Sequence, residues 1–291
     1  MLCLYQETLS VRNYQPASLK KNLQHARRFL EWTDPNNPSE ITPAKVEDYF
    51  IHLQANGSSP KTIKNHRSSV KVFCDFLCNR GMLKDNPVRH VPSRELPEEV
   101  PVFLPDNEVQ QVYRIAAEQG ITAEVTLALN TGLRMEEMRR LKWADIDLEQ
   151  RQILVRKSKG KRPRTVPINE RLMKCLLMQR ELYGHLVYVF PGGTGKRGNR
   201  NKWTLPRMRG LDWWARTAFK KIQEEIPTLR DMPKGRTGRG WHSLRHTFAT
   251  RVARAQIDIF KLKDWLGHKK VETTLRYVHL ARQYDADIEL I

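Results

Sequence analysis

Side chains suited to phosphate chemistry gather in residues 241–279. This segment holds His242-Ser-Leu-Arg245, then Leu-Gly-His268, then Arg-Tyr277. An arginine offers a planar, permanently charged donor fork that fits the nonbridging oxygens of a phosphodiester. An imidazole can donate to an oxygen or move a proton, and a phenol can act as a nucleophile. Together these types predict a site that holds a phosphodiester and attacks it.

Two further groups of the same kind lie upstream. Arg134 ends the run Thr-Gly-Leu-Arg, and Lys159 lies in the basic turn Lys-Ser-Lys-Gly-Lys-Arg at residues 157–162. Arg134 would add a second fork, and Lys159 could protonate a departing alkoxide. Lys157 and Lys161 are alternatives for that acid. The predicted site therefore needs two distant parts of the chain to fold together.

The histidines near Arg245 also raise the possibility of a metal site. His242 and Arg245 are three residues apart and share a helix face, and His246 falls close to that face. No glutamate follows His242 directly, no further ligand stands at a suitable offset, and the arginine charge would oppose a cation. We therefore predict no metal, and we expect His246 to pack or hydrogen-bond within the helices.

Tyr277 has a rival within the same tail. A phenol has a pKa of about 10, so attack on phosphorus requires local positive charge or a base. The arginines and histidines of the segment supply both. Tyr284, seven residues later, is the weaker candidate nucleophile.

Composition points to a polyanionic partner. The 291 residues include 51 Lys and Arg against 32 Asp and Glu, a formal charge of +19. Residues 196–254 alone hold 16 basic and 4 acidic side chains. Such an excess favours a nucleic acid as partner. No apolar run reaches the roughly 20 residues that span a bilayer, and the start is unlike a signal peptide, so we expect a cytoplasmic, nucleoid-associated protein without membrane contact.

The first part of the chain has the pattern of a small helical domain. Ser18, Thr42-Pro43 and Ser59-Pro60 each precede an amphipathic stretch, and Gly81 can end the third. Basic residues that recur along the third predicted helix are either a solvated face or DNA contacts. They are Lys61, Lys64, Arg67 and Lys71. The cysteines Cys3, Cys74, Cys78 and Cys175 contain no Cys-x-x-Cys and are expected to be reduced and structural.

Prolines divide the chain. Four of them fall in residues 91–106, a density that disfavours helix and interior strand. We predict a domain at 1–93, a linker at 94–105 and a second domain at 106–291. In the second domain, residues 152–156 and 164–168 flank the basic turn as a hairpin, and 186–190 is a possible third strand. Helices are expected near 108–119, 123–130, 211–226, 242–255, 258–266 and 272–280. The predicted fold is mainly α with a small antiparallel β-sheet.

These motifs resemble the tyrosine recombinases, or phage integrases. That pattern has an arginine in Thr-Gly-Leu-Arg, a hairpin lysine, His-x-x-Arg, Leu-Gly-His and a tyrosine nine residues later. The matching residues are Arg134, Lys159, His242, Arg245, His268 and Tyr277, with Glu137 supporting the first arginine. The resemblance covers nearly the whole chain. It implies a two-domain DNA clamp, with a helical, SAM-like core-binding domain before the catalytic domain and no arm-binding domain.

The resemblance also implies a reaction. Tyr277 would attack a DNA phosphate to give a 3′-phosphotyrosyl link, with Lys159 as general acid and His242 assisting proton transfer. No cofactor is needed, because each transesterification roughly conserves bond energy. Two duplexes must meet, which implies a tetramer on DNA, and the basic turn (Lys157, Lys161, Arg162) would contact the duplex. The alternatives are a noncatalytic DNA-binding protein and a type IB topoisomerase-like enzyme. Integration of a mobile element and Xer-like resolution both fit.

Overall fold

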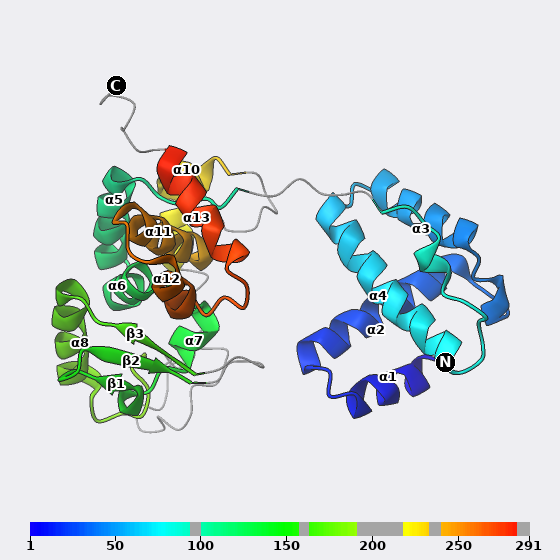
Figure 1. The fold of residues 1–291 in the computed structure, drawn as a ribbon, viewed down its shortest axis with the longest axis horizontal. Coiled ribbons are helices and arrows are strands. Elements are labelled where there is room, and N and C mark those ends of the chain that lie inside the picture. Colours follow the sequence, from blue (N-terminus) through cyan, green and yellow to red (C-terminus); the bar gives the residue numbers. More distant parts are fainter. Residues whose placement is uncertain (94–99, 157–162, 191–217, 233–239, 284–291) are drawn as a thin grey trace. The chain divides into compact units, whose positions relative to one another are not determined.

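The chain folds as two compact units, Met1–Glu98 and Glu99–Ile291. The computed structural model describes residues 1–93, 100–156, 163–190, 218–232 and 240–283, and the two units are considered separately (Figure 1). The first half of the predicted linker, 94–99, lies outside the described residues. Its second half is packed on the second unit, since Leu104 is buried and its N–H donates to Thr247 Oγ1 at 2.9 Å.

The first unit is entirely helical in its described residues. Its elements are α1 (Leu2–Val11), α2 (Pro16–Thr33), η1 (Pro38–Glu40), α3 (Pro43–Ala55), α4 (Pro60–Asn79) and η2 (Pro87–Arg89). The side chains of Thr42 and Ser59 cap α3 and α4 by accepting from Lys45 N and Thr62 N. Helix α2 begins at Pro16 and not after Ser18, because a proline at the first position has a preset φ and loses no hydrogen bond.

Helix α1 was not predicted from the sequence, because it has neither a capping side chain nor a strong apolar stripe. Tertiary packing forms it instead. Tyr5 is fully buried, with its ring centroid 5.1 Å from that of Phe73 and 5.2 Å from that of Phe76. Cys74, on the same helix as Phe73, is buried, and all four cysteines are free. The apolar core of this unit thus extends from α1 to α4.

The second unit combines helices with one small sheet. Its elements are α5 (Asp106–Glu118), α6 (Thr122–Thr131), α7 (Met135–Arg139), η3 (Trp143–Asp145), β1 (Ile146–Asp147), β2 (Gln152–Val155), β3 (Arg164–Pro167), α8 (Glu170–Tyr183), α9 (Phe219–Glu225), α10 (Pro227–Arg230), α11 (Trp241–Arg254), α12 (Ile259–Leu266) and α13 (Glu272–Gln283). Figure 1 shows α11, α12 and α13 grouped together, with the sheet beyond α6 and α12. This confirms the predicted fold class.

The sheet differs from the prediction in its third strand. Strands pair antiparallel in the order β1-β2-β3, with Ile153 opposite Val166, both fully buried. The predicted strand at 186–190 makes only an isolated bridge, Lys142 to Tyr188. Its backbone is bonded to the segment before β1, so it lies outside the sheet. The sequence also gave no prediction of α8, which Asn169 caps by accepting from Leu172 N.

The ends of α6 and α12 determine where the candidate site lies. Each helix ends at a glycine in the left-handed region, Gly132 (φ 61°) and Gly267 (φ 62°). A Cβ on Gly132 would lie 2.5 Å from Phe248 Cδ1 of α11, so this position also requires glycine for close packing. The carbonyls that these helix ends leave without helical partners face α11.

No helix within the described ranges is long and apolar enough to cross a membrane.

Candidate active site

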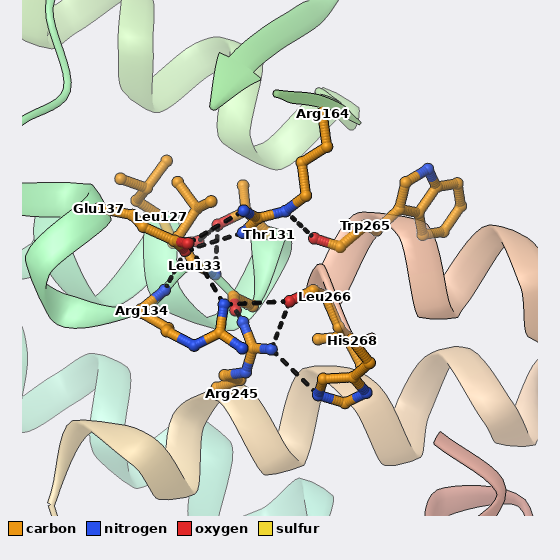
Figure 2. Close-up of polar contacts among 11 residues, drawn as sticks. Leu127, Thr131, Leu133, Arg134, Glu137, Arg164, Arg245, Trp265, Leu266 and His268 are labelled. Atoms are coloured by element: carbon orange, nitrogen blue, oxygen red, sulfur yellow. Dashed lines mark hydrogen bonds and ion pairs between the residues drawn. The ribbon is translucent and has the colours of Figure 1, made fainter. Parts of the chain in front are cut away.

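Arg245 joins three parts of the second unit. Its side chain is 1 % exposed, and its guanidinium donates to Gly132 O at 2.5 Å and to Leu266 O at 2.5 Å (Figure 2). One of its nitrogens also lies 3.2 Å from His268 Nε2. A guanidinium has more donors than these contacts use. Arg245 therefore holds the ends of α6 and α12 together and keeps donor capacity for a ligand.

Arg134 lies beside Arg245 and is more accessible. It precedes α7, and its side chain is 29 % exposed. Its Nη1 donates to Glu137 Oε1 at 3.3 Å and to Leu266 O at 3.3 Å, so both arginines contact the same carbonyl. Figure 2 shows the two guanidinium groups next to each other. Two adjacent forks give this site the positive charge that a phosphodiester needs.

A buried carboxylate fixes Arg134. Glu137 accepts from the N–H of Arg134 at 2.8 Å and receives a bidentate pair from Arg164, at 2.9 and 2.8 Å. Burial alone would raise the pKa of Glu137, but the hydrogen bonds and charges of Arg164 and Arg134 lower it to about 2. Glu137 is therefore ionised at neutral pH, as the predicted supporting role requires.

Sequence reasoning missed Arg164. Its Nε donates to Trp265 O at 2.8 Å, which connects β3 to α12 through the same side chain that pairs with Glu137. Arg164 and Val166 are two residues apart on β3 and so share a face, and Val166 is fully buried. An arginine on the buried face of a predicted strand needs an acidic partner, and that was the available signal.

His268 is oriented from both sides. Its Nδ1 lies 2.9 Å from Thr274 Oγ1, and Thr274 is fully buried at the start of α13. Its Nε2 faces Arg245. The imidazole therefore points into the arginine cluster, where it can donate to an oxygen as charge develops.

The phenol of Tyr277 lies next to these groups and contacts His246. Tyr277 is 4 % exposed, and its Oη is 2.7 Å from His246 Nδ1. The Tyr277 ring stacks on that of His268, with centroids 6.2 Å apart and planes 10° apart. Burial raises the pKa of Tyr277, and the positive charges of Arg245 and neighbouring arginines partly oppose this.

His242 lies one ring further from the phenol. It is exposed, and its ring meets that of His246 edge-on at 4.7 Å. Desolvation of the ring by the surrounding protein, together with the charges of Arg245 and Arg134, lowers the pKa of His242 to about 4. The structure thus places His246, and not His242, in direct contact with Tyr277.

Comparison with known proteins identifies the family. The model of the phage integrase family matches residues 102–284, and that of the phage integrase N-terminal SAM-like domain matches residues 2–82. The chain belongs to the phage integrase family. The match includes every predicted catalytic residue and both ends of the hairpin.

Curated relatives resemble this integrase-family chain over most of its length. A tyrosine recombinase of Thermosipho africanus is 25% identical over 95% of this chain and 93% of its own. The tyrosine recombinase XerC of Lactobacillus delbrueckii subsp. bulgaricus is 29% identical over 94% and 91%. A solved lambda integrase dimer bound to a core site covers 98% of this chain and 95% of its own, with TM-score 0.72 and 18% identity. The Tn1549 transposon integrase with circular intermediate DNA matches with TM-score 0.69 and 19% identity, covering 98% and 99%. These structures show the shared fold.

Five of the predicted residues lie in segments that the structure does not describe. Lys159, Lys157, Lys161 and Arg162 lie outside the described residues, as does Tyr284. No cluster of three or more possible metal-binding side chains occurs within the described ranges.

The predicted DNA-contacting residues on α4 divide into two groups. Lys61, Lys64 and Lys71 are exposed. Arg67 instead donates to the carbonyls of Val88 at 2.9 Å, Pro92 at 3.1 Å and Val91. Its guanidinium is thus already used within the first unit.

Proposed function

We propose that the protein is a site-specific DNA recombinase that cleaves and rejoins strands through a 3′-phosphotyrosyl intermediate. The observation that carries this is the pair of arginine forks, Arg245 buried and Arg134 partly exposed, next to the phenol of Tyr277. Each arginine is fixed by the fold, so the site needs little reorganisation to receive a phosphate. Membership of the phage integrase family supports the same reaction.

The reaction distributes roles over named side chains. Tyr277 is the nucleophile, and Arg134, Arg245 and His268 stabilise the pentacoordinate phosphorane. Lys159 gives a proton to the departing 5′ oxygen, and Glu137 holds Arg134 in place. The 5′-hydroxyl of a partner strand then attacks the phosphotyrosyl bond. The basic turn at 157–162 and the exposed lysines of α4 contact the duplex.

Assembly follows from the reaction. Exchange between two duplexes needs one active site for each of four cleaved strands, so we propose a tetramer on DNA. Such a protein would act in the cytoplasm with the nucleoid.

Covalent capture tests the proposal. Full-length protein is incubated in chelator with sheared genomic DNA of its source cell, and adducts that survive denaturant are sequenced. We expect adducts at one recurrent site, and Tyr277→Phe should abolish them because no other group replaces the phenol. Tyr284→Phe is the matched control and should still form adducts.

Other outcomes identify the alternatives. If Tyr284→Phe abolishes the adducts, Tyr284 and not Tyr277 is the nucleophile. Binding without any adduct would support the noncatalytic DNA-binding protein, and adducts spread over all sequences with relaxation of supercoils would support the topoisomerase. Cleavage that chelator stops would contradict the metal-free reaction.

A further inference from the structure

His246 and Tyr277 form a hydrogen-bonded pair across two helices. His246 lies on α11 and Tyr277 on α13, and the 2.7 Å between Nδ1 and Oη is an ordinary length for a bond with a hydroxyl donor. The phenol has a single hydrogen and the imidazole has two nitrogens. When Nδ1 carries no hydrogen, the phenol donates to it, and this is the arrangement that a proton acceptor requires.

The surroundings of the pair keep His246 neutral before DNA binds. Burial, with the adjacent His242 and the charges of Arg245 and Arg276, lowers the pKa of His246 to about 3. The charge of Arg134, at the start of α7, acts to lower the pKa of Tyr277, and the His268 ring stacks on the Tyr277 ring. The charged groups that face the pair are therefore cationic, and they oppose a further proton on His246.

A bound phosphodiester would reverse this balance. Its negative charge would lie against Arg134 and Arg245, and Arg245 is one of the charges that disfavour the imidazolium of His246. Opposite charge nearby favours the charged form of a group. His246 would therefore become basic at the moment when Tyr277 has a phosphate to attack.

We propose that His246 is a catalytic residue that takes the proton of Tyr277 during strand cleavage. This rests on the proposed recombinase function. As the bond from Oη to phosphorus forms, the phenolic hydrogen moves to Nδ1 of His246, and the bond from phosphorus to O5′ breaks. The O5′ atom takes its proton from a separate donor, the role proposed for Lys159. On rejoining, a 5′-hydroxyl attacks phosphorus and returns its proton to that separate donor, the bond to Oη breaks, and His246 returns its proton to Oη.

His242 is the alternative that the family resemblance favours. It is exposed and lies one ring beyond His246, with centroids 4.7 Å apart. It can therefore receive a proton from His246 or bind a phosphate oxygen. The histidine that contacts the phenol of Tyr277 is His246. Comparing the two histidines in one experiment assigns the role.

The test measures adduct formation against pH. Full-length His246→Asn and the matched His242→Asn are mixed with a nicked suicide duplex carrying the captured site, between about pH 6 and 9. An asparagine oxygen can accept from the phenol but cannot take its proton. We expect His246→Asn to react about 10²- to 10⁴-fold more slowly at neutral pH, and its rate to rise tenfold per pH unit as phenolate forms. Wild type and His242→Asn should show a flatter dependence.

A modified leaving group distinguishes loss of the base that accepts the proton of Tyr277 from loss of the acid that protonates O5′. A duplex with sulfur in place of the bridging 5′ oxygen releases a thiolate, which needs no proton. This duplex should restore cleavage to Lys159→Ala but not to His246→Asn. His246→Gln provides a second variant, and thermal unfolding of each shows whether it folds.

Three results would overturn the role of His246. The first is a folded His246→Asn or His246→Gln that keeps a rate within about threefold of wild type. The second is a loss that is equal at every pH, which indicates structural damage. The third is a steep pH dependence in His242→Asn instead. If the wild-type protein itself forms no adduct, the proposed recombinase function fails; if Tyr277→Phe still forms one, Tyr277 is not the nucleophile. Both results differ from these three.

Discussion

Each unit of the chain contains an arginine that binds backbone carbonyls. Arg67 on α4 donates to carbonyls at 88–92, and Arg245 on α11 donates to Gly132 O and Leu266 O. Arg67 therefore fixes the segment that follows α4, and Arg245 fixes the ends of α6 and α12. Locally the two interactions are the same, so hydrogen bonding to the backbone does not by itself make an active site.

The two arginines differ in their surroundings. Arg67 is half-buried and lies over the Phe50 ring, 5.9 Å from its centroid. Arg245 is almost fully buried, and Arg134 and His268 lie beside it. Concentrated positive charge in a desolvated place is costly unless an anion joins it. The comparison indicates that a fold-stabilising arginine becomes an anion site when a second cation is packed against it.

Among the substitutions that test this comparison, Arg245→Lys should have the largest effect. A lysine keeps the charge but cannot reach both carbonyls and a phosphate with one ammonium group. We expect adduct formation to fall on the order of 10²- to 10³-fold. The measurement is single-turnover cleavage of the suicide duplex at saturating protein. Arg67→Lys is the control and should cleave bound DNA at the wild-type rate; an equal loss in both variants would contradict the distinction between them.

Glu137→Gln should have the next largest effect, this time on stability. It leaves Arg164, whose side chain is 8 % exposed, without its anionic partner, which costs roughly 3–5 kcal/mol in the free energy of unfolding. Asp145→Asn is the matched control, because the Arg156 that pairs with Asp145 is 63 % exposed and stays hydrated. Chemical denaturation measures both. Equal losses in the two variants would show that burial of the arginine is unimportant.

The ion pair between Glu137 and Arg164 predicts that the free energy of unfolding depends on pH. Folding lowers the pKa of Glu137 from 4.5 to about 2. The stabilisation is therefore complete above about pH 4.5 and is lost as the pH falls toward 2. The stability difference between wild type and Glu137→Gln should shrink over that range. A difference that stays constant down to pH 2 would mean that the carboxylate is not the stabilising form.

Features that depend on residues close together in the chain could be predicted from the sequence. The caps at Thr42 and Ser59 and the glycine that ends α12 act within a few residues, and they were identified correctly. The motif around Arg134 and Arg245 was equally visible, because the residue types are unusual together. What was missed depends on tertiary contacts. Helix α1 forms through the burial of Tyr5, and the pairing of His246 with Tyr277 depends on how α11 meets α13.

Arg67→Lys should have a moderate effect, confined to stability. A single ammonium replaces a fork that reaches three carbonyls, so one or two hydrogen bonds are lost, at about 1 kcal/mol each. Amide hydrogen exchange in residues 60–93 should report faster opening. The second unit should exchange as in wild type. Unchanged protection in 60–93 would contradict the bracing role of Arg67.

The smallest effect is expected for Lys64→Gln, and it addresses the DNA-binding prediction for α4. Lys64 is exposed, whereas Arg67 on the same helix is engaged with carbonyls. A lysine that neutralises one phosphate contributes about 0.9 to the slope of log affinity against log salt concentration. Lys64→Gln should lower that slope by about this amount, while Arg67→Gln, which also removes one positive charge, leaves it unchanged. Binding of the captured site at several salt concentrations decides the matter. If Arg67→Gln lowers the slope and Lys64→Gln does not, the guanidinium of Arg67 leaves its carbonyls to contact DNA, and the two arginines are more alike than their contacts suggest.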